Sequence, residues 1–176
     1  ARHQWHVGRF HQRLGRRLRT HRAHRRTRRP DEDQSRLFSG IGEFGILGFI
    51  EAYDVNTGKK AWRFYTVAGP DEPGGHTWPK GSDAYLRGGG SIWVTGTYDP
   101  EQNLVFFGTG NPGPGYYSAV REGDNLYTAS LVALDADTGK LRWHYQKTPH
   151  DTHDWDGNQI PVQADVTIGG KPRRVV

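Results

Sequence analysis

The chain has 176 residues, enough for one ordinary domain, and its 24 glycines, 10 prolines and 12% aromatic residues favour a turn-rich β protein over a helical one. It contains no cysteine, so disulfides and thiolate metal ligands are excluded and the redox compartment is left undetermined. No stretch approaches the apolar length of a membrane span, and the start lacks the apolar core of a signal peptide, so we expect neither feature in this chain.

The net charge of +5 hides two unlike regions. Residues 1–30 hold eleven arginines, five histidines and no acidic residue. The other 13 basic residues are outnumbered by all 19 acidic ones, which gives residues 31–176 a formal charge of −6. The composition therefore predicts a mildly acidic body preceded by a basic leader.

The leader, residues 1–37, has few apolar side chains and no useful periodicity, so we expect it to be disordered. Three interpretations are open: a nucleic-acid arm held by phosphate contacts, a solvated tail, or a stretch translated in the wrong reading frame. The density of arginine and histidine ends abruptly where well-patterned sequence begins, at Phe38. This favours the last two interpretations, and nucleic-acid binding is not expected.

A repeated pattern, Ala-x-Asp-x-x-Thr-Gly-x-x-x-Trp, occurs at Ala52–Trp62 and again 81 positions later at Ala133–Trp143. Around the first copy, Phe49–Tyr53 and Ala61–Val67 read as paired strands joined by an Asp/Thr-Gly turn. A hairpin unit that recurs at this scale is typical of a β-propeller, whose blades take about 40–45 residues each. The interval therefore predicts two blades, with another hairpin between the copies, and an all-β fold.

That intervening hairpin lies in Gly88–Pro114, with expected strands at Ile92–Tyr98 and Leu104–Gly108. Trp93 follows three glycines that allow close approach of a ligand or backbone, and Asn111 sits in a loop stopped by proline. A flat aromatic surface and an amide oxygen on adjacent strands suit a planar cofactor and a hard cation. A core tryptophan and a turn asparagine are the alternative.

Further elements follow in chain order. We expect a strand at Leu126–Asp135 and a last hairpin of Val162–Ile168 and Lys171–Val176 that turns at Gly169-Gly170. Long loops on a rigid β scaffold usually line the functional face. The expected loops are residues 68–90, 115–125 and 148–157.

Oxygen donors gather in three of these segments: Gly42–Gly45, the Asn111 loop, and the loop with Asp151, Asp154 and Asp156. Carboxylate and amide oxygens are the ligands that hard cations prefer. His150 and His153 lie in the same acidic loop, but no third nitrogen or sulfur ligand stands at a spacing suited to zinc. We expect these histidines to form hydrogen bonds within the loop.

From about Gly40 to Val176 the chain resembles the pyrroloquinoline quinone (PQQ)-dependent methanol/ethanol dehydrogenases, which are eight-bladed propeller quinoproteins. The tryptophan repeat alone is shared with non-enzymatic propellers, whereas an ordered set of four segments is specific. These segments are GEFG…GFIEAYDVNTGKKAWRF, GGGSIWVTGTYDPEQNLVFFGTGNPGP, GDNLYTASLVALDADTGKLRWHYQ and TPHDTHDWDG.

The resemblance implies roles for individual residues. Glu43 and Asn111 match metal-binding positions of the family. Trp93 matches the tryptophan that stacks beneath PQQ, Ser91 matches a hydroxyl position that hydrogen-bonds the cofactor, and Gly42 belongs to the cofactor contacts before Glu43.

Two carboxylates complete the implied site. Asp154 matches the catalytic aspartate, the proposed base, and also a metal ligand. Asp156 matches an extra carboxylate of lanthanide-using members, which calcium-using members usually lack, so a lanthanide is favoured over Ca²⁺. The implied chemistry is hydride transfer from an alcohol to metal-polarised PQQ while Asp154 takes the alcohol proton.

By resemblance, the function is PQQ-dependent oxidation of a primary alcohol to the aldehyde, in the periplasm, with cytochrome c as electron acceptor. Residues 38–176 are expected to form roughly three blades of the propeller, with tryptophan-docking repeats, and this piece is expected to be largely inactive alone. The alternative is a non-enzymatic propeller that serves as a binding scaffold.

Overall fold

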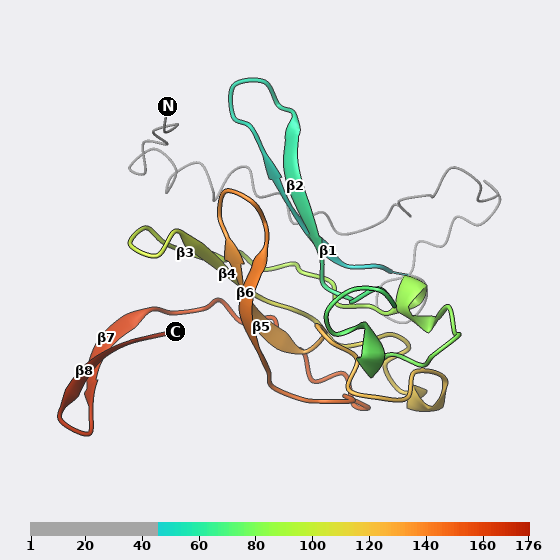
Figure 1. Ribbon diagram of the computed structural model, residues 1–176. Helices are drawn as coiled ribbons and strands as arrows, with labels where there is room; N and C mark the ends of the chain where they lie inside the picture. The colour runs from blue at the N-terminus through green and yellow to red at the C-terminus, as the bar shows by residue number, and fades with distance from the viewer. Residues whose placement is uncertain (1–45) are drawn as a thin grey trace.

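The computed structural model describes residues 46–176. The predictions for the leader (residues 1–37), for Gly42 and for Glu43 lie outside these residues. The described part contains eight strands in three antiparallel sheets and three short 3-10 turns, and no α-helix (Figure 1). It holds no helix long and apolar enough to cross a membrane. The all-β prediction is confirmed for this part of the chain.

The central sheet has four strands in the order β3-β4-β5-β6. Their bounds are Thr97–Asp99, Leu104–Gly108, Ser130–Asp135 and Leu141–Gln146. Strand β4 is buried along its whole length because both of its faces are covered. Val105 and Phe107 join the main core, whereas Leu104 and Phe106 pack with Ala133 on the other face. This sheet is the rigid base from which the site loops project.

Two hairpins flank the central sheet: β1 (Phe49–Tyr53) with β2 (Lys60–Tyr65), and β7 (Ala164–Ile168) with β8 (Lys171–Val175). Glu51 of β1 is buried, and its carboxylate accepts a 2.6 Å hydrogen bond from Arg63 Nε across the pair. The last hairpin turns at Gly169 and Gly170, as predicted.

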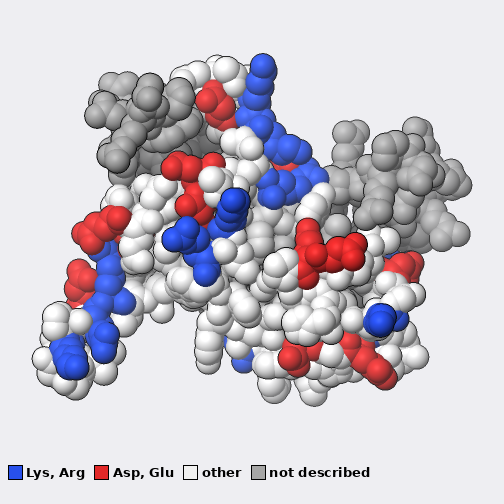
Figure 2. All heavy atoms as spheres, in the orientation of Figure 1, with Lys and Arg blue, Asp and Glu red and all other residues white. Residues whose placement is uncertain are grey.

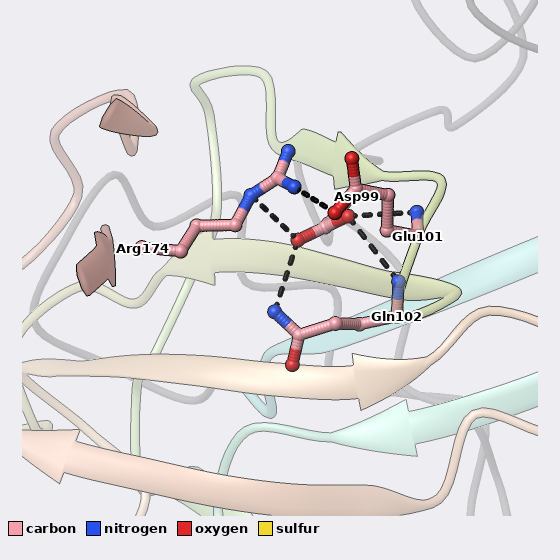
Figure 3. A network of polar contacts seen from close by, with 4 residues as sticks. All are labelled: Asp99, Glu101, Gln102 and Arg174. Carbon is pink, nitrogen blue, oxygen red and sulfur yellow. Dashed lines mark hydrogen bonds and ion pairs between the residues drawn. The ribbon is translucent and has the colours of Figure 1, made fainter. Parts of the chain in front are cut away.

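An acidic clasp ties the last hairpin to the central sheet (Figure 3). The carboxylate of Asp99 is buried and accepts hydrogen bonds from the backbone of Glu101 and Gln102. Arg174 of β8 reaches it, with Nε 3.3 Å from Asp99 Oδ2, and also pairs with Glu101. Figure 2 shows the basic side chains of this hairpin beside the acidic ones of the sheet. These contacts attach the last hairpin to the central sheet.

The two copies of the repeat contact each other directly. Trp62 of the first copy donates a 3.0 Å hydrogen bond from its indole nitrogen to the carbonyl of Ala136 in the second. Its ring also lies so close to Gly139 that an added Cβ would be 2.5 Å from it. The copies are therefore neighbours in space.

The structure of the residues between the two copies differs from the prediction. The hairpin β3–β4 pairs with β5 and so belongs to the sheet of the second copy, not to a separate blade. The estimate of two blades was wrong because residues 66–96 form a long loop with two 3-10 turns, η1 (Gly75–Thr77) and η2 (Ala84–Arg87), and add no strand. Spacing alone cannot separate a blade from a loop of the same length.

Two strands begin four or more residues later than predicted, and β7 begins two residues later, at Ala164. β3 begins at Thr97, and just before the predicted start the carbonyl of Ser91 accepts a hydrogen bond from Gly110 instead of pairing in the ladder. β5 begins at Ser130, since Asn125 and Ala129 adopt left-handed backbone angles (φ of 60° and 46°) that interrupt an extended chain. Both shortened stretches become part of the loop face.

Figure 1 shows these long loops gathered at the lower right, while the turns of the β1–β2 and β5–β6 hairpins point to the top of the view and the β7–β8 turn lies at the lower left. Backbone hydrogen bonds join the loops, for example from Ala68 to Leu126 and from His150 to Asp124. The third 3-10 turn, η3 (Ser118–Val120), lies in this loop region.

Candidate functional site

Gly110 is the point at which the predicted site segments meet. Its N–H donates to Ser91 O over 2.9 Å. A Cβ added to Gly110 would lie 3.0 Å from the ring of Trp93 and 3.1 Å from Asp156 Oδ1. The same Cβ would lie 2.9 Å from the carbonyl oxygen of Ser91, so a side chain here would force the backbone of Ser91 to shift. The structure thus brings Ser91, Trp93 and Asp156 together, with Trp93 52% exposed.

Asn111 joins the same cluster through its backbone, whose N–H donates to Asp156 Oδ1 over 3.0 Å. Its side-chain nitrogen donates to the carbonyl of Pro112 over 3.0 Å, a bond that does not use the amide oxygen. The carbonyl of Asn111 accepts a 2.9 Å bond from Gly90, in the glycine run before Trp93. The loop is therefore held by its backbone, and the amide oxygen is left for another partner.

The acidic loop is organised by Asp151, which is buried. One carboxylate oxygen accepts from His153 N over 2.9 Å and the other from Trp155 N over 2.8 Å. Both oxygens of Asp151 therefore shape the loop. Asp154 stands exposed in this loop with a left-handed φ of 63°. An aspartate tolerates this conformation better than most residues.

His153 forms a hydrogen bond within the loop, as expected, whereas the side chain of His150 bonds to another loop. His153 Nδ1 lies 2.7 Å from Thr152 Oγ1, and its ring stacks on Trp155. His150 Nδ1 lies 2.7 Å from the carbonyl of Gly123, in a neighbouring loop.

Electrostatic repulsion concentrates at Asp156. Burial raises the pKa of its carboxyl, and the charges of Asp154 and Asp151 raise it further, against a lowering by the Asn111 N–H. A cation placed among these groups would relieve the repulsion and stabilise the ionised form.

The described residues contain no group of three or more His, Cys, Asp or Glu side chains arranged to hold a metal ion. Of the three predicted carboxylate ligands, only Asp154 and Asp156 lie in this part of the chain, since Glu43 is outside it, and the fourth predicted ligand, Asn111, is an amide. The available donors near Gly110 are oxygens, and with Asp154 and Asp156 they carry negative charge. In donor type and in charge they fit a hard cation.

Residues 40–176 match the family model described as “Glucose/ethanol/alcohol dehydrogenase, beta-propeller domain”. The chain belongs to this family. The resemblance to PQQ-dependent alcohol dehydrogenases is thereby confirmed, as is the β-propeller class. The eight blades of the whole propeller, the roughly three blades expected for residues 38–176 and the tryptophan-docking role of the repeats stay predictions.

Relatives of this dehydrogenase family cover much of the chain. Quinohemoprotein alcohol dehydrogenase ADH IIB of Pseudomonas putida is 46% identical over 150 residues, which are 78% of this chain and 22% of that protein. Methanol dehydrogenase [cytochrome c] subunit 1 of Methylorubrum extorquens is 37% identical over 165 residues, or 82% of this chain and 26% of that protein.

Among solved structures, a europium-containing methanol dehydrogenase is 36% identical, with a TM-score of 0.70, over 77% of this chain and 26% of that chain. The chain thus spans about a quarter or less of the length of these dehydrogenases.

Sequence analysis missed two buried residues of this dehydrogenase domain. Asn158 donates from Nδ2 to Ser91 O over 2.9 Å, and its Oδ1 is buried with no hydrogen-bond partner among the described residues. Arg121 lies fully buried behind the site loops. The Gly157-Asn158 pair after the acidic loop was a usable signal for the first. Arg121 stands in a polar, glycine-containing loop, where an arginine normally indicates a solvated side chain.

Proposed function

We propose that the protein containing this chain oxidises a small primary alcohol to its aldehyde, with PQQ as electron acceptor and one metal ion beside it. One observation carries the proposal: Trp93, Asn111 and the acidic loop meet around Gly110. The names of the relatives, alcohol and methanol dehydrogenases, support the same reaction class.

The half-exposed ring of Trp93 offers a flat apolar surface for a planar cofactor, beside Ser91. Asn111 Oδ1, Asp154 and Asp156, with Glu43 from outside the described part, would hold the metal ion. When bound, PQQ supplies a two-electron acceptor and the metal supplies Lewis-acid polarisation. Gly42 is proposed as a further cofactor contact.

Asp154 is proposed as the general base. Oxidation of RCH₂OH to RCHO releases two electrons and two protons, and an ionised carboxylate within reach of the hydroxyl can take the first proton. Asp154 is exposed and held by a loop whose shape depends on Asp151, so it is both accessible and oriented. A neighbouring cation favours its ionised form, which a base requires.

A trivalent lanthanide is the favoured metal, with Ca²⁺ as the alternative. Asp156 adds a second carboxylate two residues after Asp154, and its charge suits a trivalent ion better than a divalent one. The europium-containing relative supports this choice.

For the whole protein we propose a cytochrome c as electron acceptor and a periplasmic location. The name of the Methylorubrum extorquens relative includes cytochrome c, which supports the acceptor. Residues 38–176 are proposed to form part of an eight-bladed propeller in which the repeat tryptophans dock between blades. Residues 1–37 are proposed to be a separate leader without a role in catalysis.

Terbium(III) luminescence tests the site in this chain, because an indole excites a bound lanthanide only when the two are close. We expect the purified chain to bind terbium with sensitised emission, and PQQ to quench the fluorescence of Trp93. Asp154→Ala should weaken terbium binding, whereas Asp71→Ala, an exposed loop carboxylate elsewhere, should not. Equal binding by both variants would favour the non-enzymatic scaffold.

A second experiment distinguishes a lanthanide from Ca²⁺ as the preferred metal. Asp156→Ala should lower the affinity for La³⁺ more than the affinity for Ca²⁺, because the variant removes one negative charge. An equal loss for both ions would contradict the lanthanide assignment.

A further inference from the structure

Arg121 is the largest side chain that the fold buries completely, with an exposed fraction of 0%. A buried guanidinium needs partners for its donors, since desolvating a charged group is costly. Its side chain donates to four oxygens of described residues, all of them neutral, so its charge is not consumed in an ion pair with one carboxylate.

These four hydrogen bonds join three segments of the chain. Nε donates to Pro114 O over 3.0 Å and Nη2 to Gly115 O over 3.0 Å, both just after Asn111. Nη2 also donates to Asp151 O over 2.5 Å, at the start of the acidic loop.

The third segment is the loop of Arg121 itself. Nη1 donates to Asn125 Oδ1 over 2.9 Å, and Asn125 Nδ2 returns a 2.7 Å bond to the carbonyl of Arg121. Asn125 is also fully buried, and its N–H donates to Thr77 O. The guanidinium is therefore held by its own loop as well as by the two other segments.

The connection bears on the site because each contacted segment carries a proposed site residue. Asn111 stands three positions before Pro114, and Asp154 stands three positions after Asp151. At their other ends the same two loops meet through the bond from Asn111 N to Asp156 Oδ1. The loops are thus joined near Asn111 and Asp156, where Gly157 N also donates to Thr109 O over 3.1 Å, and at their other ends through Arg121.

We propose that Arg121 is a positioning residue that sets the separation of Asn111 from Asp154 and Asp156, and so assembles the cation site without touching it. The inference rests on the proposed function. Arginine is required because its planar fork offers five N–H donors in fixed directions, whereas a lysine offers three from a single point.

The first test needs no ligand. In Arg121→Gln we expect amide hydrogen exchange to accelerate at Asn111 and Trp155, whose N–H groups do not contact the guanidinium. Protection in β4 and β5 should change less. The matched control is Arg63→Gln, which removes a partly buried arginine from the separate β1–β2 hairpin and should leave Asn111 and Trp155 protected.

The second test measures terbium affinity. We expect Arg121→Gln to weaken binding about tenfold, the usual scale for a residue that supports metal ligands, and Arg63→Gln to leave it unchanged. Arg121→Lys keeps the charge with fewer directed donors and should fall between. Arg121→Lys also allows both tests to be carried out if Arg121→Gln does not fold.

The outcomes separate the two hypotheses. Uniform acceleration of exchange, or unchanged terbium affinity in a folded Arg121 variant, would overturn the positioning role. Absence of terbium binding by the unaltered chain would overturn the proposed function instead, and the exchange pattern would still decide whether Arg121 couples the two loops.

Discussion

The two copies of the repeat form the same turn but have different surroundings. Asp54 Oδ1 accepts from the N–H and hydroxyl of Thr57 over 2.7 and 2.9 Å. Asp135 Oδ1 accepts from Thr138 in the same way, over 2.9 and 2.8 Å. These bonds explain the spacing of aspartate and threonine in the motif.

The tryptophans that end the two copies differ. Trp62 lies over Gly139 and donates to Ala136, whereas Trp143 packs against Phe106 and is 38% exposed. The turn glycines differ correspondingly, since a Cβ on Gly58 would meet no described atom within 4 Å. Local sequence therefore specifies the turn. The contribution of each tryptophan to stability depends on the element that packs against it.

The largest expected effect comes from removing the tryptophans. Trp62→Ala should lower the free energy of unfolding by about 3 kcal/mol, the lower end for an aromatic truncation, because the ring is partly exposed. Trp143→Ala should cost about half as much, since more of its ring is already in water. Urea denaturation measures both, and equal losses would show that the contact with the second copy contributes little.

The turn glycines should show a smaller difference. Both adopt left-handed angles, φ of 71° at Gly58 and 70° at Gly139, so alanine costs about 1–2 kcal/mol at either site. Gly139→Ala should cost about 1 kcal/mol more, because the new methyl group collides with the Trp62 ring. In a Trp62→Ala background this excess should vanish. If Gly139→Ala still cost more than Gly58→Ala in that background, the extra cost would not come from the contact with Trp62.

The smallest effect concerns the turn carboxylates. Hydrogen bonds from Thr57 lower the pKa of Asp54. Burial alone would raise the pKa of Asp135, but bonds from Thr138 and Asp137 outweigh it and lower the pKa. Because both folded-state values lie below the unfolded one, each ionised carboxylate stabilises the fold above about pH 4 and loses that contribution as the pH falls through the folded value.

Asparagine at either position should therefore flatten the acid limb of the stability curve between about pH 5 and pH 2. Urea midpoints measured at several pH values for Asp54→Asn and Asp135→Asn provide the test. An unchanged acid limb in both variants would remove the turn carboxylates as a source of pH dependence.

Turns and hairpins could be predicted because their signals are local. Asp and Thr at fixed spacing, Gly169-Gly170 and the alternation in β1 each act within a few residues. The assignment of β3–β4 to the second copy could not be predicted, because it depends on pairing with β5 across a loop.

The candidate site was predicted only in part for the same reason. Trp93, Asn111 and Asp156 stand in distinctive segments, and the structure brings them to Gly110. The burial of Arg121 follows from carbonyls that three loops turn inward, and no pattern within any one loop indicates it. Glu43 lies outside the described residues, so its place in the site stays a prediction.

Loss of the contact between Asp99 and Arg174 would be detectable as faster protease cleavage of the last hairpin. A two-stranded hairpin is marginally stable alone, so its order depends on the contacts of Arg174 with the buried carboxylate of Asp99 and with Glu101. Trypsin cuts after arginine, and Arg173 and Arg174 stand side by side in β8. Asp99→Asn should therefore open this strand to rapid tryptic cleavage while the central sheet resists digestion.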